Sequence, residues 1–119
     1  MGATTLKTVT TEELDRKIQG DVGLHVWNVL NDEWFKGELI PGSRRVPLSG
    51  LEAAVKRSSL RKEDPIVVYC AGPHCSSSRE AAEKLSELGY SGVAAYEGGL
   101  EQWKQAGRDV LRQSPTRVA

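Results

Sequence analysis

The stretch PIVVYCAGPHCSSSR, residues 65–79, decides the fold of this chain. Its first part, Ile66–Tyr69, is a short apolar run rich in β-branched residues, which is typical of a buried strand in a parallel sheet. Its last part opens a helix, because Ser78 is a candidate N-cap and apolar residues follow at helical spacing: Ala81, Ala82, Leu85 and Leu88. Cys70 is therefore predicted to lie at the carboxyl end of a strand, facing a helix N-terminus, where open α/β sheets bind ligands.

The rest of the chain alternates between the same two kinds of element. Strand patterns occur at residues 8–10, 24–29, 45–46 and 93–96, and helix patterns at residues 11–19, 51–55 and 100–105, with one or two helical turns at 31–36. Thr10 and Glu13 form a capping box for the first helix. The alternation predicts an α/β fold: a mainly parallel sheet with helices on both faces. We expect one domain over residues 1–119, with an ordered core at about 5–111 and a polar tail at 112–119.

Composition excludes several classes of function. Sixteen basic residues balance sixteen acidic ones, so no nucleic-acid or anionic-membrane partner is expected. No apolar run reaches the length of a membrane span, and the first residues do not resemble a signal peptide. Two cysteines make no disulfide framework, which favours a cytoplasmic protein with reduced thiols. We also expect a monomer.

The position of Cys70 favours a thiolate. An ordinary thiol needs a pKa shift of roughly two units, about 3 kcal/mol, to be mostly ionised at neutral pH. A helix dipole supplies about 0.3–2 kcal/mol of this. Backbone N–H groups of the Gly- and Ser-containing loop would have to supply the remainder. The alternative is that Cys70 is a small buried apolar residue at a strand end.

Three segments in order resemble the single-domain rhodaneses, a family of sulfurtransferases. The first contains Phe35 and the Ile-Pro-Gly-Ser motif at residues 40–43; the second is the Cys70 strand, loop and helix; the third contains Leu-Gly-Tyr at 88–90, Tyr-Glu-Gly-Gly at 96–99 and Trp103. The resemblance implies a rhodanese domain with Cys70 as catalytic nucleophile and no metal or organic cofactor. Cys70 would take a sulfane sulfur from thiosulfate, mercaptopyruvate or a persulfide, including a protein persulfide. The Cys70 persulfide would then pass that sulfur to a thiol or to cyanide.

The resemblance also implies which residues bind the persulfide. The substrate loop would comprise Ala71, Gly72, Pro73, His74, Cys75, Ser76, Ser77, Ser78 and Arg79. This loop is longer than is usual in the family, which predicts a larger or differently shaped pocket. It has no Lys or Arg between Cys70 and Ser78, which weakens the case for a small dianionic donor. Asn28-Val29-Leu30 stands where the family commonly has Asp-Val-Arg, and Leu39 stands in place of a His.

Other readings of the cysteines remain open. Cys75 could be a resolving thiol that attacks a Cys70 persulfide, or a surface residue of a variable loop. The same pair could make the domain a non-catalytic redox-sensing or protein-binding module. A zinc site would need Cys70, His74, Cys75 and the distant His25, and no spacing signal supports it. A phosphatase-type Cys-x5-Arg loop is absent, because Ser76 stands at the required position. The basic residues Arg44, Arg45, Lys56 and Arg57 are expected on the solvated surface.

Overall fold

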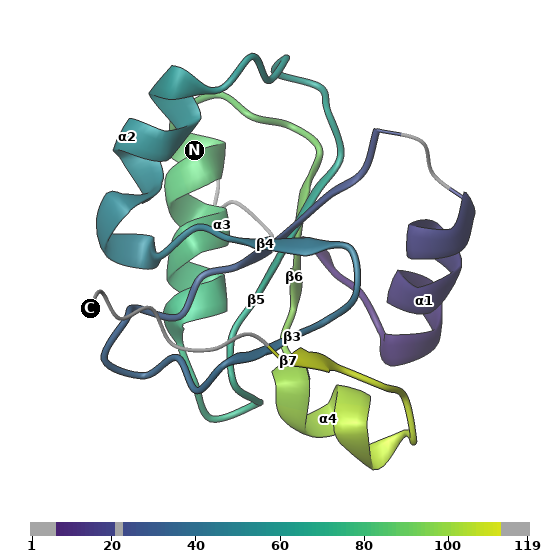
Figure 1. Cartoon of the computed structure of the whole chain (residues 1–119). Helices are drawn as coiled ribbons and strands as arrows, with labels where there is room; N and C mark the ends of the chain where they lie inside the picture. Colours follow the sequence, from purple (N-terminus) through teal and green to yellow (C-terminus); the bar gives the residue numbers. More distant parts are fainter. Residues whose placement is uncertain (1–6, 21–22, 113–119) are drawn as a thin grey trace.

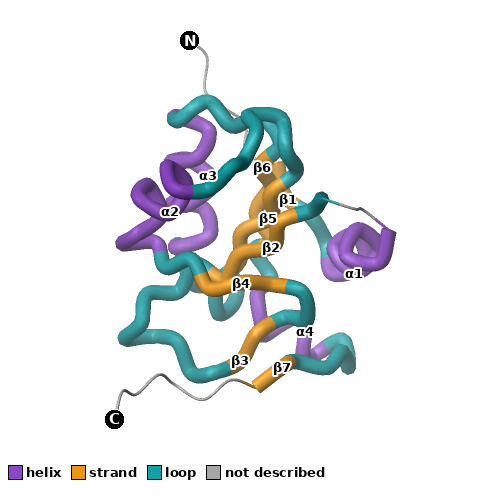
Figure 2. Tube along the Cα trace, turned by 45° about the horizontal axis from the view of Figure 1, so that its top comes forward, coloured by secondary structure: helices purple, strands orange, loops and turns teal. Residues whose placement is uncertain are grey.

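A five-stranded parallel sheet forms the centre of the molecule, as predicted. The computed structural model describes residues 7–20 and 23–112. The strand order is β1–β6–β5–β2–β4, and every neighbouring pair is parallel (Figure 2). The strands are β1 (Lys7–Thr8), β2 (His25–Asn28), β4 (Ser43–Arg45), β5 (Ile66–Tyr69) and β6 (Val93–Tyr96).

Helices cover both faces of this sheet, which confirms the predicted α/β class. They are α1 (Thr11–Gly20), α2 (Leu51–Arg57), α3 (Ser77–Glu87) and α4 (Gly99–Gln105), and a short 3₁₀ turn, η1 (Leu48–Gly50), precedes α2. Helices α2 and α3 lie together on one side of the strands, whereas α1 lies on the other (Figures 1 and 2). In the described ranges, no helix is long and apolar enough to cross a membrane.

The central strand β5 is buried on both of its faces. All four of its residues are at most 2% exposed, which is why their sequence shows no alternation of apolar and polar residues. At its carboxyl end the buried Tyr69 hydroxyl accepts a hydrogen bond from the Ile40 N–H at 3.0 Å and lies 2.7 Å from Ser43 Oγ. Through these two hydrogen bonds, Tyr69 holds the Ile-Pro-Gly-Ser turn against the sheet, next to Cys70.

The capping box at the start of α1 is confirmed. The Glu13 N–H donates to Thr10 Oγ1 at 3.1 Å, and the Thr10 N–H donates to Glu13 Oε1 at 2.8 Å. Two N–H groups that the helix itself leaves without partners are thereby satisfied.

Asn28 links the end of β2 to the turn that follows it by a hydrogen bond, although the rhodanese pattern has Asp at this position. The Asn28 side chain is fully buried, and its Oδ1 accepts from the Leu30 N–H at 3.0 Å. Arg45 donates to the Leu30 carbonyl at 2.5 Å, pairs with Asp32 at 2.6 Å and stacks over the Phe35 ring at 4.0 Å. Arg45 therefore holds together the turn that follows β2.

One prediction about local structure was confirmed and two were wrong. Residues 31–36 contain a helical turn, in which the Trp34 and Phe35 N–H groups donate to the Asn31 carbonyl at 2.9 and 3.1 Å. Ser78 is not the N-cap of α3, because the helix begins at Ser77 and Ser78 lies buried within its first turn. Arg112, assigned to the tail, lies in β7 (Leu111–Arg112), which pairs antiparallel with β3 (Glu38–Leu39). The remainder of the predicted tail, 113–119, lies outside the described residues.

Candidate active site

Cys70 directly follows the central strand, so its position in the sheet is the one that the sequence predicts. Neighbouring strands β2 and β6 end level with it, because Tyr69 pairs with Asn28 on one side and Tyr96 on the other. Cys70 is only 1% exposed. The loop after it, residues 71–76, leads into α3, whose N-terminus therefore lies at the same edge of the sheet.

The N-terminus of α4 anchors the first part of this loop. The Leu100 N–H donates to the Cys70 carbonyl at 3.1 Å, and the Glu101 N–H donates to the Ala71 carbonyl at 2.8 Å. Gly99 permits this approach: its φ is +60°, and a Cβ there would lie 2.5 Å from the Cys70 carbonyl oxygen and 2.7 Å from the Gly72 nitrogen. Gly99 was not among the predicted site residues, although two consecutive glycines, Gly98 and Gly99, are a typical turn signal.

The two cysteines lie against one another. Cys70 Sγ donates to the Cys75 carbonyl oxygen at 3.4 Å, and the Cys75 N–H closes a turn onto the Gly72 carbonyl at 3.0 Å. The interaction between the two side chains raises the pKa of Cys70, which burial raises most, and lowers the pKa of Cys75. The loop thus forms one dithiol site from both cysteines of the chain.

The prediction that Cys70 rests as a thiolate was wrong. Burial, followed by the hydrogen bond with Cys75, raises the pKa of Cys70 to about 11. The Ser78 N–H and hydroxyl oppose this shift but do not outweigh it. Water exclusion disfavours the charged sulfur more than the few nearby donors favour it.

Cys75 is the cysteine that ionises first. Its partial burial raises its pKa, but hydrogen bonds from Cys70 and from the backbone at Ser77 and Ala71 together lower it below its ordinary value. Cys75 is also more exposed than Cys70. The site therefore pairs a buried protonated thiol with a more accessible and more acidic one.

Ser78 places a spare donor beside Cys70. Its Oγ is buried and has no hydrogen-bond partner among the residues that the structure describes. Both its hydroxyl and its N–H lie close enough to Cys70 to lower that pKa. An unsatisfied buried hydroxyl costs about 1–3 kcal/mol. If a second, anionic sulfur were added to Cys70, the Ser78 hydroxyl could donate a hydrogen bond to it.

The remaining loop residues face outward. Ala71, Pro73, His74, Ser76 and Arg79 are exposed, Ser77 is half-buried and Gly72 is buried. Arg79 pairs with Glu97 at 3.3 Å, so its charge is directed toward that carboxylate. A depression of about 530 Å³ opens beside the loop, where Pro73, Glu97 and Gly98 form part of its wall.

The four residues of the zinc alternative are not brought together. His25 begins β2 and pairs in register with Ile66, at the start of β5, whereas Cys70 follows the other end of that strand. Within residues 7–20 and 23–112, no three His, Cys, Asp or Glu side chains form a group that could hold a metal ion.

Comparisons with known proteins identify the family. The model of the family described as "Rhodanese-like domain" matches residues 10–106. The SseB protein of Mycobacterium tuberculosis is 33% identical over 96 residues, which cover 78% of this chain; the chain spans about one third of that relative's length. The thiosulfate sulfurtransferase GlpE of Coxiella burnetii is 30% identical over 77 residues, covering 65% of this chain and 68% of GlpE.

A solved structure shows the same architecture. The BH2092 protein of Bacillus halodurans superposes with a TM-score of 0.77 at 32% identity, covering 87% of this chain and 75% of that one. The family match includes β2, β5 and β6, the Cys70 loop and the α4 turn that anchors it. This chain belongs to the rhodanese-like domain family.

Proposed function

We propose that this domain is a sulfurtransferase that carries a sulfane sulfur as a persulfide on Cys70. The observation that carries the proposal is the pairing of a buried thiol at the end of β5 with the unpartnered Ser78 hydroxyl. GlpE, a relative of similar length, is named a thiosulfate sulfurtransferase, which supports the reaction class.

Activation of Cys70 begins with its proton. Because Cys75 ionises first, its thiolate would accept the Cys70 proton when the S–H turns from the Cys75 carbonyl oxygen, 3.4 Å away, to the Cys75 sulfur. Proton transfer to an adjacent base is a general way to activate a nucleophile whose own pKa is high. In this mechanism Cys75 is a general base and Cys70 is the nucleophile.

Sulfur loading is a displacement at the donor's outer sulfur. With thiosulfate, a bond forms between Cys70 Sγ and the outer sulfur, the sulfur–sulfur bond of thiosulfate breaks, and sulfite leaves with the electron pair. The outer sulfur then carries the negative charge. Ser78 Oγ, with the backbone N–H groups at the start of α3, would stabilise this charge as preorganised donors.

The donor and acceptor follow from the surroundings of the loop. Arg79 is the only Lys or Arg from 71 to 79, and it pairs with Glu97 at 3.3 Å, so attraction of a dianionic donor is weak. We therefore infer a preference for donors with less charge, such as mercaptopyruvate or a persulfide, over thiosulfate. A thiol or cyanide would accept the sulfur.

Steady-state assays of thiocyanate formation test this function. Wild-type protein should convert cyanide to thiocyanate with mercaptopyruvate or thiosulfate as donor, with the higher kcat/KM for mercaptopyruvate, and Cys70→Ser should be inactive. Cys75→Ser should retain the reaction at a lower rate. Equal activity of folded Cys70→Ser and wild type would contradict the proposal.

A second candidate is a redox module that uses both cysteines, because Cys70 Sγ lies 3.4 Å from the Cys75 carbonyl oxygen and both thiols are free. In the resolving reaction, the Cys75 thiolate attacks Sγ of the Cys70 perthiol: the Cys70–Cys75 bond forms and the bond to the outer sulfur breaks. Hydrosulfide leaves with the outer sulfur and its proton. Mass spectrometry of persulfidated protein distinguishes the two candidates, because a redox module accumulates the disulfide and shows little turnover.

A further inference from the structure

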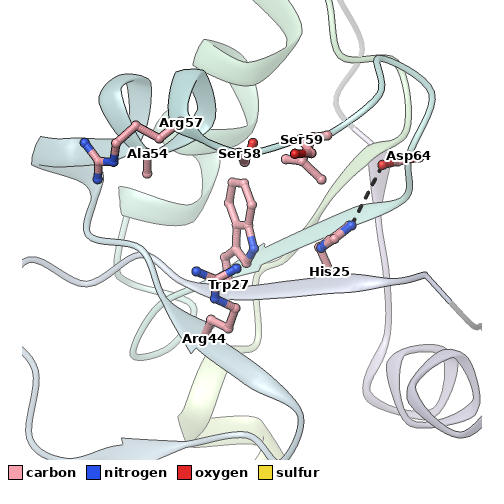
Figure 3. A pocket seen from close by; sticks show the side chains of 9 residues that line it. His25, Trp27, Arg44, Ala54, Arg57, Ser58, Ser59 and Asp64 are labelled. Carbon is pink, nitrogen blue, oxygen red and sulfur yellow. Dashed lines mark ion pairs between the residues drawn. The ribbon is translucent and has the colours of Figure 1, made fainter.

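A second pocket lies on the α2 side of the sheet, at the opposite end of the strands from Cys70. It has a volume of about 550 Å³. Its walls come from β2 and β4, the end of α2 and the connection from α2 to β5 (Figure 3). Neither cysteine contributes to it, so the proposed sulfur chemistry does not use this pocket.

Two arginines without ion-pair partners line the pocket. Arg44 lies beside Trp27 because the two residues are paired in register between β4 and β2. Arg57 ends α2, next to Ser58 and Ser59. Neither guanidinium forms an ion pair with any residue in the described part of the chain.

The acidic residue that lines the pocket, Asp64, pairs with a histidine of the same pocket rather than with either arginine. Asp64 lies 3.9 Å from His25 Nε2, and this pair stands at the end of the pocket away from Arg57 (Figure 3). The neighbouring Lys56 points its charge at Glu52, at 3.6 Å. The two arginines therefore leave the pocket with an excess of positive charge.

A second observation, independent of the arginines, is that the indole N–H of Trp27 has no hydrogen-bond acceptor in the part of the chain that the structure describes. The residue is 3% exposed, and its Nε1 has no hydrogen-bond partner among the described residues. Buried indole N–H groups usually find an acceptor, so an orphaned one is an exception that calls for a reason. The indole stands between Arg44 and His25, in the middle of the pocket (Figure 3).

We propose that this pocket binds a small organic phosphate. The phosphate oxygens would accept from the Arg44 guanidinium, which lies beside Trp27, and from the Arg57 guanidinium after this exposed side chain turns inward. A small shift of the indole would open its buried N–H to one phosphate oxygen. The pocket is larger than inorganic phosphate needs, and Ala54, Leu60 and the Trp27 ring provide an apolar wall for the organic part. This is a ligand site separate from the sulfur-transfer site.

The indole N–H resonances of the three tryptophans provide a direct test. Phenyl phosphate is titrated into ¹⁵N-labelled full chain, and Trp27→Phe assigns the Trp27 signal. That signal should shift saturably while the Trp34 and Trp103 signals do not. Inorganic phosphate should bind more weakly than phenyl phosphate, and phenol should give no saturable shift.

Matched variants distinguish binding in this pocket from nonspecific attraction of phosphate to positive charge on the protein. Arg44→Gln and Arg57→Gln should each raise the Kd for phenyl phosphate by about tenfold, the loss expected for one charge-assisted contact. Arg16→Gln removes the same charge from an exposed position on α1, across the sheet, and should leave the Kd unchanged.

Cys70→Ser should also leave the Kd unchanged, so the result is independent of the sulfurtransferase function. No saturable Trp27 shift with phenyl phosphate would overturn the proposal. Equal weakening by Arg16→Gln, or saturable binding of phenol with the same affinity, would overturn it too.

Discussion

Replacing Gly99 with alanine tests whether α4 holds the Cys70 loop in place. At φ +60° an alanine costs about 1–2 kcal/mol relative to glycine. Its Cβ would also lie 2.5–2.8 Å from backbone atoms of Cys70, Ala71 and Gly72, where no flexible side chain can move aside. Overpacking of this kind adds about 1–3 kcal/mol, so Gly99→Ala should lower the free energy of unfolding by about 2–5 kcal/mol.

Gly107→Ala is the matched control for this experiment. Gly107 also has a positive φ, +80°, but a Cβ there would meet nothing within 4 Å. Its replacement should therefore cost only the conformational part, about 1–2 kcal/mol. Urea unfolding of the two variants measures the difference. Equal destabilisation would refute the argument that the α4 turn and the Cys70 loop are in close contact.

Three further predictions concern the chemistry and stability of the site. Iodoacetamide at neutral pH should modify Cys75 before Cys70, because Cys75 is more acidic and more exposed; peptide mapping that finds the opposite order would contradict the pKa directions. Ser78→Ala should slow persulfide formation by at least about tenfold in stopped-flow measurements yet should not lower the free energy of unfolding by more than about 1 kcal/mol, since removing the unpartnered hydroxyl also removes its desolvation cost; an unchanged rate would remove Ser78 from the mechanism. The free energy of unfolding should fall as the pH rises from 9 toward about 11, because the folded protein retains the Cys70 proton that the unfolded chain releases, and Cys70→Ser should reduce this slope in pH-dependent denaturation.

The elements with strong local signals were predictable from the sequence. The unbroken apolar run of β5 identified a strand buried on both faces, and Thr10 with Glu13 identified the start of α1. Strand β7 was not predictable, because Glu38 pairs with Arg112 far along the chain and both strands are only two residues long. Such pairings depend on tertiary packing rather than on local pattern.

The position of Cys70 at the end of β5 was predicted correctly from the sequence, but its electrostatics were not. A helix N-terminus and a loop of small residues suggested a thiolate at Cys70. The raised pKa of Cys70 depends instead on how deeply the loop buries the sulfur and on where Cys75 contacts it. Neither can be read from the spacing of residues in the sequence. The pocket around Trp27 and Arg44 was missed for a related reason, because it is assembled from segments whose contact only the sheet register reveals.

The most direct test of the central proposal is to locate the transferred sulfur. Reduced wild-type protein, Cys70→Ser and Cys75→Ser are incubated separately with mercaptopyruvate and with thiosulfate, and intact masses and peptides are measured. The proposed function predicts a gain of one sulfur atom, about 32 Da, on the Cys70 peptide of wild type and Cys75→Ser, and none in Cys70→Ser. A sulfur gain located on Cys75, or retained in Cys70→Ser, would contradict it.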